Sequence, residues 1–413
     1  MVPKIRFQSF STPLVKYKVE DILERFTSPV LVNKTQKYRE IGIRSHGRGL
    51  FHKDEVLGSE LGSKRVFWVK KDALILNIVF AWEQAIALTS AEDEGFIASH
   101  RFPMYYPKEN KCNIDYIRRY FLTKKGKSLL ESASPGGAGR NKTLGQKNFN
   151  ELVLSIPDIL EQTKIADFLN SVDEIIKLVD KQHALLSDYK KGVMQKIFSQ
   201  ELRFKDDNGK AFPEWKIKSF RTLYSLLGTN SLSRNELNYE NGIVKNIHYG
   251  DIHTKFNCLF DINKELVPYI SKEIKITEDN LCRKGDLVIA DASEDYNDIG
   301  KCIEIVNVGQ QQIVAGLHTF LARPSTNMAL GFGSYMMQSS EVRKQIKVIA
   351  TGVSVLSVTK KNLLELMLPL PSIGEQTKIA NFLATIDDKI ILKKAELDKL
   401  TTWKQALIQK MFV

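Results

Sequence analysis

The chain of 413 residues lacks several short motifs on which common enzymes depend. It contains no Pro-Pro pair and therefore no Asn-Pro-Pro-Tyr type motif of adenine methylation. Its seven histidines show no His-Glu-x-x-His or other metal-ligand spacing, which argues against a metal site. Four cysteines without Cys-x-x-Cys spacing indicate neither a zinc ribbon nor a disulfide framework, so we expect reduced, mostly buried thiols. They are Cys112, Cys258, Cys282 and Cys302.

Long hydrophobic runs are also missing. The longest apolar stretch, Ala73 to Leu88, contains Asn77, Glu83 and Gln84 and is too short to cross a bilayer. The N-terminus has no basic segment followed by an apolar one, which a secretion signal would need. We therefore expect a cytoplasmic protein.

Partial catalytic motifs fall short of the patterns that the chemistry requires. Gly126-Lys-Ser128 lacks the glycine five residues earlier that a phosphate loop needs, and Gly331-Phe-Gly333 has no third glycine for a dinucleotide site. Asp387-Asp-Lys389 has the spacing of half a nuclease motif, but it falls in a segment with strong helix signals. We expect solvent-exposed charge there.

The composition describes a folded, basic protein. With 43% hydrophobic and 26% charged residues, the chain is long enough for two or three packed cores. A formal net charge of +12 favours an anionic partner such as nucleic acid, because basic side chains neutralise phosphates and release counterions. A merely solvated basic surface would give the same charge.

An internal duplication is the strongest positive signal. Residues 157–198 align without a gap to residues 371–412 at an offset of 214, with 18 identities in 42 positions. The similarity extends upstream, where residues 146–157 match residues 360–371. Weaker similarity links the starts of the two halves. The chain therefore consists of two half-proteins, each a variable body followed by a shared segment.

The duplicated segments carry helix signals. Pro157 and Pro371 suit the start of a helix, and Glu161 and Glu375 place negative charge near the positive end of its dipole. Apolar residues then recur every three or four positions, which is typical of a coiled-coil seam. The expected seam contains Ile165, Phe168, Val172, Ile175, Val179, Leu186, Tyr189 and Val193, and in the second copy Ile379, Phe382, Ile386, Ile390, Leu397, Leu400, Trp403, Leu407 and Met411.

The expected fold is α+β, with two mixed bodies joined by two long antiparallel helices that form a coiled coil with a pseudo-two-fold relation. The bodies occupy roughly residues 20–145 and 216–359, and short β-branched runs in both predict buried strands. They are distantly similar to each other, since residues 69–77 parallel 282–290 and residues 97–103 parallel 314–320.

Three loops in these bodies are rich in groups that can read base edges, namely residues 43–52, 244–255 and 290–297. Arginine can pair with guanine, asparagine with adenine, and a carboxylate with the cytosine amine. Any single residue in them could equally be an ordinary loop or surface residue. The candidate DNA-binding residues are Arg44, His46, Arg48, His52, Arg65, Arg101, Lys245, Asn246, His248, Tyr249, Asp251, His253, Lys255, Ser293, Asp295 and Tyr296.

The order of body, helix, body and helix resembles the specificity subunits of Type I restriction-modification systems. The doubled Glu-Gln-Thr-Lys-Ile-Ala at 161–166 and 375–380 carries most of this resemblance. Tyr249-Gly-Asp251, Lys284-Gly-Asp286 and Arg44-Ser-His-Gly-Arg48 resemble recurring phrases of the recognition domains.

The resemblance implies a non-catalytic chain whose two target recognition domains bind the halves of a split, asymmetric DNA target. The implied division is a first recognition domain at 1–150, a first conserved helix at 151–200, a linker at 201–215, a second recognition domain at 216–364 and a second conserved helix at 365–413. The helices would act as a ruler that fixes the spacer between the half-sites.

The same resemblance implies partners. Two methylation subunits would dock on the helices and methylate adenine with S-adenosylmethionine, and two restriction subunits would add ATP-driven translocation and cleavage with magnesium. This chain itself would bind no cofactor and no metal. The residues that match the family motif, and that we expect to help assembly, are Glu161, Gln162, Lys164, Glu375, Gln376 and Lys378.

Two other classes of function stay open at this level. A stand-alone DNA-modifying enzyme would bind S-adenosylmethionine as an isolated chain. A DNA-independent coiled-coil scaffold would leave the net charge of +12 unexplained and would show no salt-dependent DNA binding.

Overall fold

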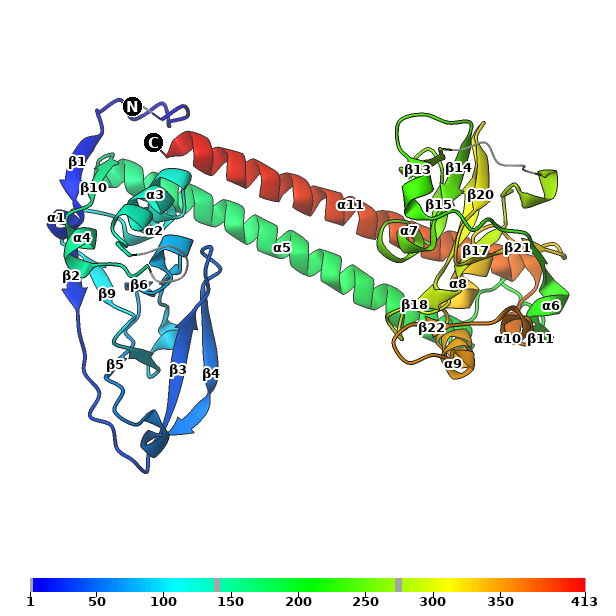
Figure 1. The fold of residues 1–413 in the computed structure, drawn as a ribbon, viewed down its shortest axis with the longest axis horizontal. Coiled ribbons are helices and arrows are strands. Elements are labelled where there is room, and N and C mark those ends of the chain that lie inside the picture. The colour runs from blue at the N-terminus through cyan, green and yellow to red at the C-terminus, as the bar shows by residue number, and fades with distance from the viewer. Residues whose placement is uncertain (1–2, 137–141, 272–276, 413) are drawn as a thin grey trace. The chain divides into compact units, whose positions relative to one another are not determined.

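Two long helices, α5 (Ile159–Phe198) and α11 (Ile373–Met411), correspond to the duplicated segments. The computed structural model describes residues 3–136, 142–271 and 277–412, and the chain divides into two units (Figure 1). The first unit contains Met1–Val179 and Glu396–Val413, and the second contains Asp180–Ala395. Each unit therefore holds one body together with part of both long helices.

Each helix begins where the sequence predicts. The Asp158 side chain accepts the Glu161 N–H at 3.0 Å and so satisfies one of the free N–H groups of the first turn of α5. The Gln162 side-chain amide donates to the Pro157 carbonyl at 2.8 Å. Gln376 repeats this contact with Pro371 at 2.9 Å at the start of α11. The predicted helix starts are confirmed.

The helices run antiparallel, as contacts inside each unit show. In the first unit, Lys404 of α11 forms an ion pair with Asp173 of α5. In the second, Lys190 of α5 lies 2.6 Å from Asp387 of α11. At the offset of 214, Lys190 corresponds to Lys404 and Asp173 to Asp387, so the duplication repeats the same ion pair with the helices exchanged.

The seam is narrower than the heptad pattern predicted. Ile165, Val172, Val179 and Val193 are buried, but Ile175 and Tyr189 are 49% and 55% exposed, and Trp403 of α11 is 47% exposed. The prediction that Ile175 and Tyr189 lie in the seam is wrong, whereas Trp403 still packs edge-on against Phe168 of α5 at 6.3 Å. Two helices in contact cover only one narrow stripe of each other, so wider apolar positions need an additional neighbour.

The two halves also start alike. The Leu202 N–H donates to Lys196 O at 2.9 Å, and the Ile5 N–H donates to Lys410 O at 3.1 Å, which is the equivalent carbonyl of α11. The segment that follows α5 in the second unit is thus supplied in the first unit by the N-terminal residues. The weak sequence similarity between the starts of the halves reflects this shared arrangement.

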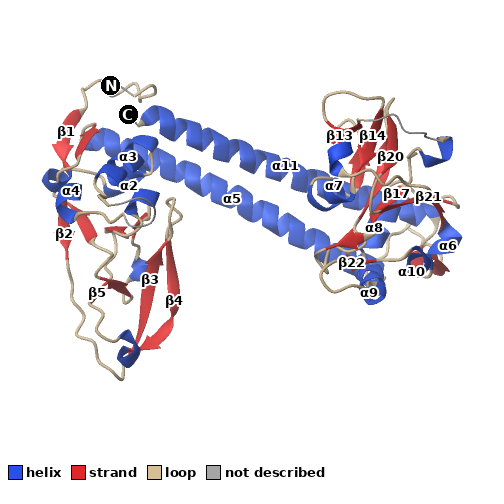
Figure 2. Cartoon of the chain, viewed as in Figure 1, coloured by secondary structure: helices blue, strands red, loops and turns tan. Residues whose placement is uncertain are grey.

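The first body consists of two four-stranded sheets with short helices (Figure 2). One sheet has the order β2-β9-β6-β7 and the other the order β4-β3-β8-β5. The strands are β2 (Leu23–Phe26), β3 (Lys37–Ile43), β4 (Leu50–Leu57), β5 (Val66–Trp68), β6 (Leu74–Leu76), β7 (Ile86–Leu88), β8 (Ile97–Ser99) and β9 (Met104–Pro107). The helices are α1 (Val19–Ile22), α2 (Ile114–Phe121), α3 (Lys124–Ser132) and α4 (Gln146–Asn150), and β1 (Val15–Lys18) pairs with β10 (Val153–Ile156) before α5.

The second body has a five-stranded sheet of order β12-β21-β17-β19-β15 and a four-stranded sheet of order β13-β16-β14-β20. Its strands are β12 (Tyr224–Leu227), β13 (Leu237–Asn238), β14 (Val244–Ile247), β15 (Leu259–Asp261), β16 (Tyr269–Ile270), β17 (Leu287–Ala290), β18 (Ala292–Ser293), β19 (Cys302–Asn307), β20 (Gln312–Ala315), β21 (Thr319–Pro324) and β22 (Leu356–Ser357). The helices are α6 (Phe220–Leu223), α7 (Tyr249–Thr254), α8 (Phe332–Gln338), α9 (Ser340–Ile349) and α10 (Lys360–Leu364), and β11 (Lys216–Ser219) pairs with β23 (Met367–Leu370) before α11.

The two bodies share their central strand pairings and the register of those pairs, although their sheets differ in the edge strands. Leu23 lies opposite Pro107 in the first, and Tyr224 lies opposite Pro324 in the second. Leu74 pairs with Tyr105 as Leu287 pairs with Ala322. Glu40 pairs in parallel with Ile97 as Asn246 does with Val314. These pairs occupy equivalent positions of a shared scaffold, and the predicted similarity of the two bodies is confirmed.

In each unit, one hydrophobic cluster contains apolar side chains from both the body and the adjoining helix ends. In the first unit Phe412 stacks on Tyr116 at 4.9 Å, and in the second Phe198 packs against Phe332 at 6.1 Å. Residues 412 and 198 are equivalent in the duplication. In the part of the chain that the structure describes, no helix combines the length and apolarity that a membrane span requires.

Candidate nucleic-acid interface

A parallel strand pair places two polar loops together in the first body. β3 and β8 are parallel, with Glu40 paired to Ile97, so their carboxyl ends reach the same edge of the sheet. Arg44, His46 and Arg48 follow β3, and Arg101 follows β8. All four side chains are exposed.

The loop after β3 is held in a defined conformation. His46 and Gly47 have φ angles of 61° and 64°, and their N–H groups donate to Glu83 O at 2.7 Å and Gln84 O at 2.9 Å. The left-handed backbone at His46 is uncommon for a residue other than glycine. Arg44 lies over the Phe51 ring at 5.0 Å and donates to Leu50 O. The loop therefore presents its basic groups from a fixed backbone.

The other two candidates of this body, His52 and Arg65, differ in the contacts that they make. His52 stacks on Phe96 at 4.2 Å and contacts Asp93 at 2.8 Å. Burial raises the pKa of Asp93, but the hydrogen bonds from His52 and Ser90 outweigh it and lower the pKa below its usual range. Arg65 is exposed, and its carbonyl accepts the His100 N–H, which places it beside the loop after β8.

The second body uses the same edge. β14 and β20 are parallel neighbours (Figure 1), so His248 and Tyr249, which follow β14, meet His318, which follows β20. The Tyr249 ring lies 4.7 Å from His248 and 5.3 Å from His318. His318 also contacts Asp291 at 3.2 Å. The segments that follow β14 and β20 therefore form one polar cluster.

Several candidates of the second body are buried, so their side chains cannot read bases in this conformation. Asn246 accepts a hydrogen bond from Asn230 at 2.6 Å, Ser293 hydrogen-bonds within its own loop, and His248 is almost fully buried. We correct the prediction for these three and for Asp251. Their hydrophilic character serves internal hydrogen bonds rather than an outward surface.

Asp251 is a structural anchor. Its carboxylate, 1% exposed, accepts Arg234 at 2.7 Å and Lys255 at 2.9 Å. Burial raises the pKa of Asp251, but hydrogen bonds from Arg234 and Lys255 outweigh burial and lower it below the usual range. Burial also lowers the pKa of His248, which keeps the ring neutral beside Arg234. The Tyr-Gly-Asp phrase thus fixes the backbone after β14.

The remaining candidates are at least partly exposed. Lys245 lies over the Tyr269 ring at 4.8 Å, and Lys255 stays exposed beside Asp251. His253 contacts Ala292 O at 2.9 Å. The Tyr296 hydroxyl donates a hydrogen bond to Lys347 O of α9. Asp295 is exposed, and Ser293 accepts its N–H.

Sequence reasoning missed His318, Asp291 and Arg234. His318 falls in a segment that the sequence comparison of the bodies did align, at the position of Arg101. That alignment was the available signal. Asp291 lies in the 290–297 loop that the sequence did single out, although it is not among the chosen candidates. Arg234 carries no signal of its own, since its role depends on a contact across 17 residues.

The repeated motif residues of the helices are mostly internal. Glu161 is buried and accepts Arg6 Nε at 2.8 Å, and Glu375 is buried and accepts Arg203 Nε at 3.0 Å. Gln162 and Gln376 are also buried and accept the N–H groups of Asn113 and Ala329. The two glutamines join each body to its helix, and the two glutamates join the segment before each body to its helix, so direct side-chain contact with a partner is corrected for all four.

Two motif lysines reach the surface to different extents. Lys164 is exposed and lies over the Phe7 ring at 5.9 Å. Lys378 is partly exposed and forms an ion pair with Asp207 at 2.7 Å. Partner docking stays a prediction for this pair.

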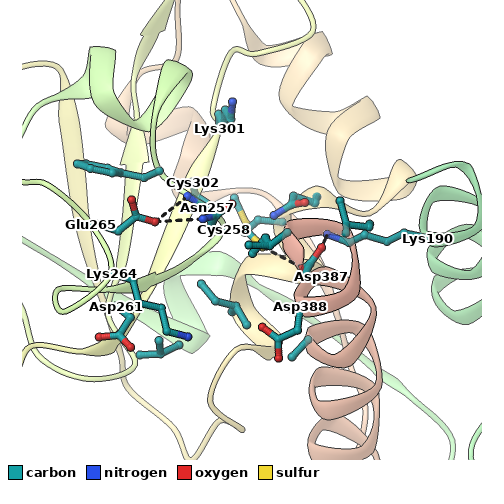
Figure 3. A pocket seen from close by; sticks show the side chains of 18 of the residues that line it. Lys190, Asn257, Cys258, Asp261, Lys264, Glu265, Lys301, Cys302, Asp387 and Asp388 are labelled. Carbon is teal, nitrogen blue, oxygen red and sulfur yellow. Dashed lines mark hydrogen bonds and ion pairs between the residues drawn. The ribbon is translucent and has the colours of Figure 1, made fainter. Parts of the chain in front are cut away.

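A hollow of about 640 Å³ lies in the second unit between the body and α11 (Figure 3). Asp387 projects into it, where it contacts Lys190 and accepts the Tyr335 hydroxyl at 2.7 Å. The expectation of solvent-exposed charge at Asp387 is therefore corrected, although its neighbour Asp388 is exposed. Burial raises the pKa of the adjacent Cys258 thiol, which is then unreactive at neutral pH.

The two polar loop edges indicate a binding surface. Among residues 3–136, 142–271 and 277–412, no three His, Cys, Asp or Glu side chains are grouped to hold a metal ion. Two copies of one scaffold, each with a polar loop edge and each tied to both long helices, define a tandem recognition protein. The basic charge and the arginine-bearing loop of the first body point to nucleic acid as the recognised molecule.

Comparison with known proteins gives the family. The family described as "Type I restriction modification DNA specificity domain" matches residues 16–187 and 332–402, which is more than half of the chain. The chain belongs to this family. It is 24% identical over 313 residues to the type I restriction enzyme MjaVIII specificity subunit of Methanocaldococcus jannaschii, covering 73% of this chain and 70% of that protein. Its role as a specificity subunit, not as an enzyme, follows from this relationship.

Solved structures share the fold. The HsdS subunit from Thermoanaerobacter tengcongensis matches with a TM-score of 0.51 and 16% identity, over 98% of this chain and 97% of that one. The Type I restriction-modification S subunit from M. genitalium matches with a TM-score of 0.57 and 13% identity, over 100% and 99%. The predicted fold class is confirmed.

Proposed function

We propose that this chain recognises a bipartite, asymmetric DNA target and directs adenine methylation and restriction by partner subunits. The observation that carries this proposal is the repeated scaffold with unlike loops. Arg44, His46 and Arg48 occupy one strand edge, whereas Tyr249 and His318 occupy the equivalent edge. Similar scaffolds with different exposed groups suit two different half-sites.

The long helices supply the second part of the proposal, which is docking of two methylation subunits. Leu178 and Leu392 are equivalent in the duplication, and they are 58% and 68% exposed. Tyr189 and Trp403 form a second equivalent pair of half-exposed residues. Large apolar side chains are exposed at equivalent positions of both helices. This recurrence supports two similar docking sites, because exposed leucines without a function would have no reason to recur.

Restriction subunits complete the proposed complex. S-adenosylmethionine, ATP and magnesium would bind to the partners and not to this chain. The complex would act in the cytoplasm. Lys164 and Lys378 are the motif residues that reach the surface, Lys378 with its ammonium paired to Asp207, and they are the candidates for assembly contacts.

Docking is tested by stoichiometry. Leu178→Asp or Leu392→Asp alone should leave one methylation subunit per chain, and the double change should leave none, because a charge in an apolar contact is costly. Native mass spectrometry of the co-purified complex measures this. Leu31→Asp, at a 95% exposed leucine outside the helices, is the matched control. Two bound subunits in the double variant would contradict the docking sites.

Recognition is tested with the assembled complex. DNA binding should weaken steeply with salt, and methylome sequencing of a host expressing the complex should give a split, non-palindromic motif. DNA binding that does not depend on salt concentration would favour the alternative of a coiled-coil scaffold. S-adenosylmethionine binding by the isolated chain would favour a stand-alone enzyme.

A further inference from the structure

The loop after β8 and the loop after β20 occupy the same position of the shared scaffold. The Ile78 N–H donates to Arg101 O at 3.0 Å in the first body, and the Asp291 N–H donates to His318 O at 3.0 Å in the second. The strands that follow agree, since Met104 pairs with Ile75 as Leu321 pairs with Val288. Arg101 and His318 are therefore equivalent residues.

Both side chains are available at this position. Arg101 is exposed, and among the described residues its guanidinium has no hydrogen-bond acceptor. The His318 side chain is 50% exposed and lines a hollow of about 630 Å³ with Asn230 and Thr319. A scaffold role would not require either residue type, because the hydrogen bonds that fix the loops come from the backbone.

His318 is held in an unfavourable backbone conformation. Its φ angle is 54°, in the left-handed region that costs free energy for residues other than glycine. Asp291 fixes the imidazole from one side at 3.2 Å, and the Tyr249 ring packs edge-on against the other at 5.3 Å. A strained, doubly supported and half-exposed side chain is typical of a functional position.

The contact with Asp291 also sets which atoms the ring offers. A carboxylate only accepts, so Nδ1 of His318 donates to Asp291, and Nε2 is the ring nitrogen left to contact a base. In the uncharged form of the ring, Nε2 is an acceptor. An acceptor fits the exocyclic amine of adenine or cytosine in the major groove. Arg101 instead offers two parallel donors, which fit O6 and N7 of guanine.

We propose that Arg101 and His318 are paired specificity-determining residues, each of which reads one base of its own half-site. Arg101 would select guanine in the first half-site, and His318 an amine-bearing base in the second. Asp291 is a positioning residue that holds the His318 ring. This inference rests on the proposed function and adds the residues that make the two half-sites differ.

The experiment compares base preferences of the complex with methylation subunits, using targets randomised one position at a time. His318→Ala should reduce the preference at one position of the second half-site by roughly 5- to 150-fold and leave the first half-site unchanged. Arg101→Ala should do the same at one position of the first. The unaffected half-site shows that the complex is folded.

Asp291→Asn gives a second readout that a purely structural role would not produce. The asparagine amide can donate to Nδ1, which leaves Nε2 of His318 protonated and converts it from acceptor to donor. The preferred base should then change from an amine-bearing to a carbonyl-bearing one. His318→Arg should move the preference toward guanine.

Lys37→Ala and Lys284→Ala are the matched controls, since both lysines are exposed at the opposite strand ends. The inference would be overturned if His318→Ala weakened DNA binding equally for all sequences, or changed the base preference at no position, while the wild-type complex still read two half-sites. A wild-type complex with no split target would instead contradict the proposed function.

Discussion

At the scale of single residues, the Arg234–Asp251 ion pair shows how polar loop residues serve the fold. Arg234→Ala should leave the buried Asp251 carboxylate with Lys255 alone and lower the free energy of unfolding of the second unit by on the order of 3 kcal/mol. DNA affinity should weaken equally for all sequences. Urea unfolding of the complete chain and a binding titration measure the two effects.

The control for this change is Arg221→Ala. Arg221 and Glu365 form an ion pair in which both side chains are more than half exposed, so its loss should cost well under about 1 kcal/mol. A selective change of one base preference in Arg234→Ala, with unaltered stability, would show that this arginine reads DNA.

At the scale of elements, the start of α8 is sensitive to pH. Glu304 is buried and accepts the N–H groups of Gly331 at 2.6 Å and Ser334 at 2.9 Å. Burial raises the pKa of Glu304 from near 4.5 to about 7, despite these hydrogen bonds. The folded protein therefore holds a proton that the unfolded chain releases.

The contribution of this proton to the free energy of unfolding is fully present below about pH 4.5 and is lost as the pH rises through about 7. Glu304→Gln cannot titrate, so the difference in melting temperature between wild type and variant should shift in favour of the variant from pH 5 to pH 8. Thermal unfolding at both pH values measures this. An identical pH dependence of the two proteins would show that Glu304 is ionised throughout.

The long helices show what element-level patterns can and cannot predict. Their ends and antiparallel pairing follow from the duplicated segments. Each copy carries its own start signals, and each supplies one lysine and one aspartate to the two equivalent ion pairs between the helices, of which Lys190–Asp387 is one. The exposure of Ile175 and Trp403 does not follow. A heptad pattern specifies an apolar stripe, but the width of the stripe that is covered depends on how many neighbours the helix has.

At the scale of the whole molecule, the helices are proposed to set the spacer of the DNA target. Inserting one heptad after Val179 and another after Lys393 keeps the apolar stripes in phase and adds about 10 Å to each helix. Both half-sites should persist while the spacer lengthens by about three base pairs. Methylome sequencing reads the spacer directly.

Added DNA rotation of about 100° could weaken binding of the lengthened protein, so the insertion is judged by the motif and not by affinity. Inserting a heptad in only one helix is the control, since it shifts one helix against the other and should abolish assembly. The original spacer at full methylation in the double insertion would mean that the helices do not act as a ruler.

The sequence by itself determined the duplication, the helices, the strand-rich bodies and the family resemblance. These features are encoded locally, by periodicity, start signals and a repeated phrase, so no knowledge of distant contacts is needed. The alignment of Ile97–Pro103 with Val314–Phe320 even contained the equivalence of Arg101 and His318.

Only the tertiary structure decided which polar residues face outward. Asn246 and His318 both lie in polar loops, yet Asn246 is buried and His318 is half exposed. The difference arises because β14 pairs with β20, which lies 68 residues further along the chain at the Asn246–Val314 pair. Side-chain burial depends on such non-local pairing, whereas a sequence pattern reports only the neighbours along the chain.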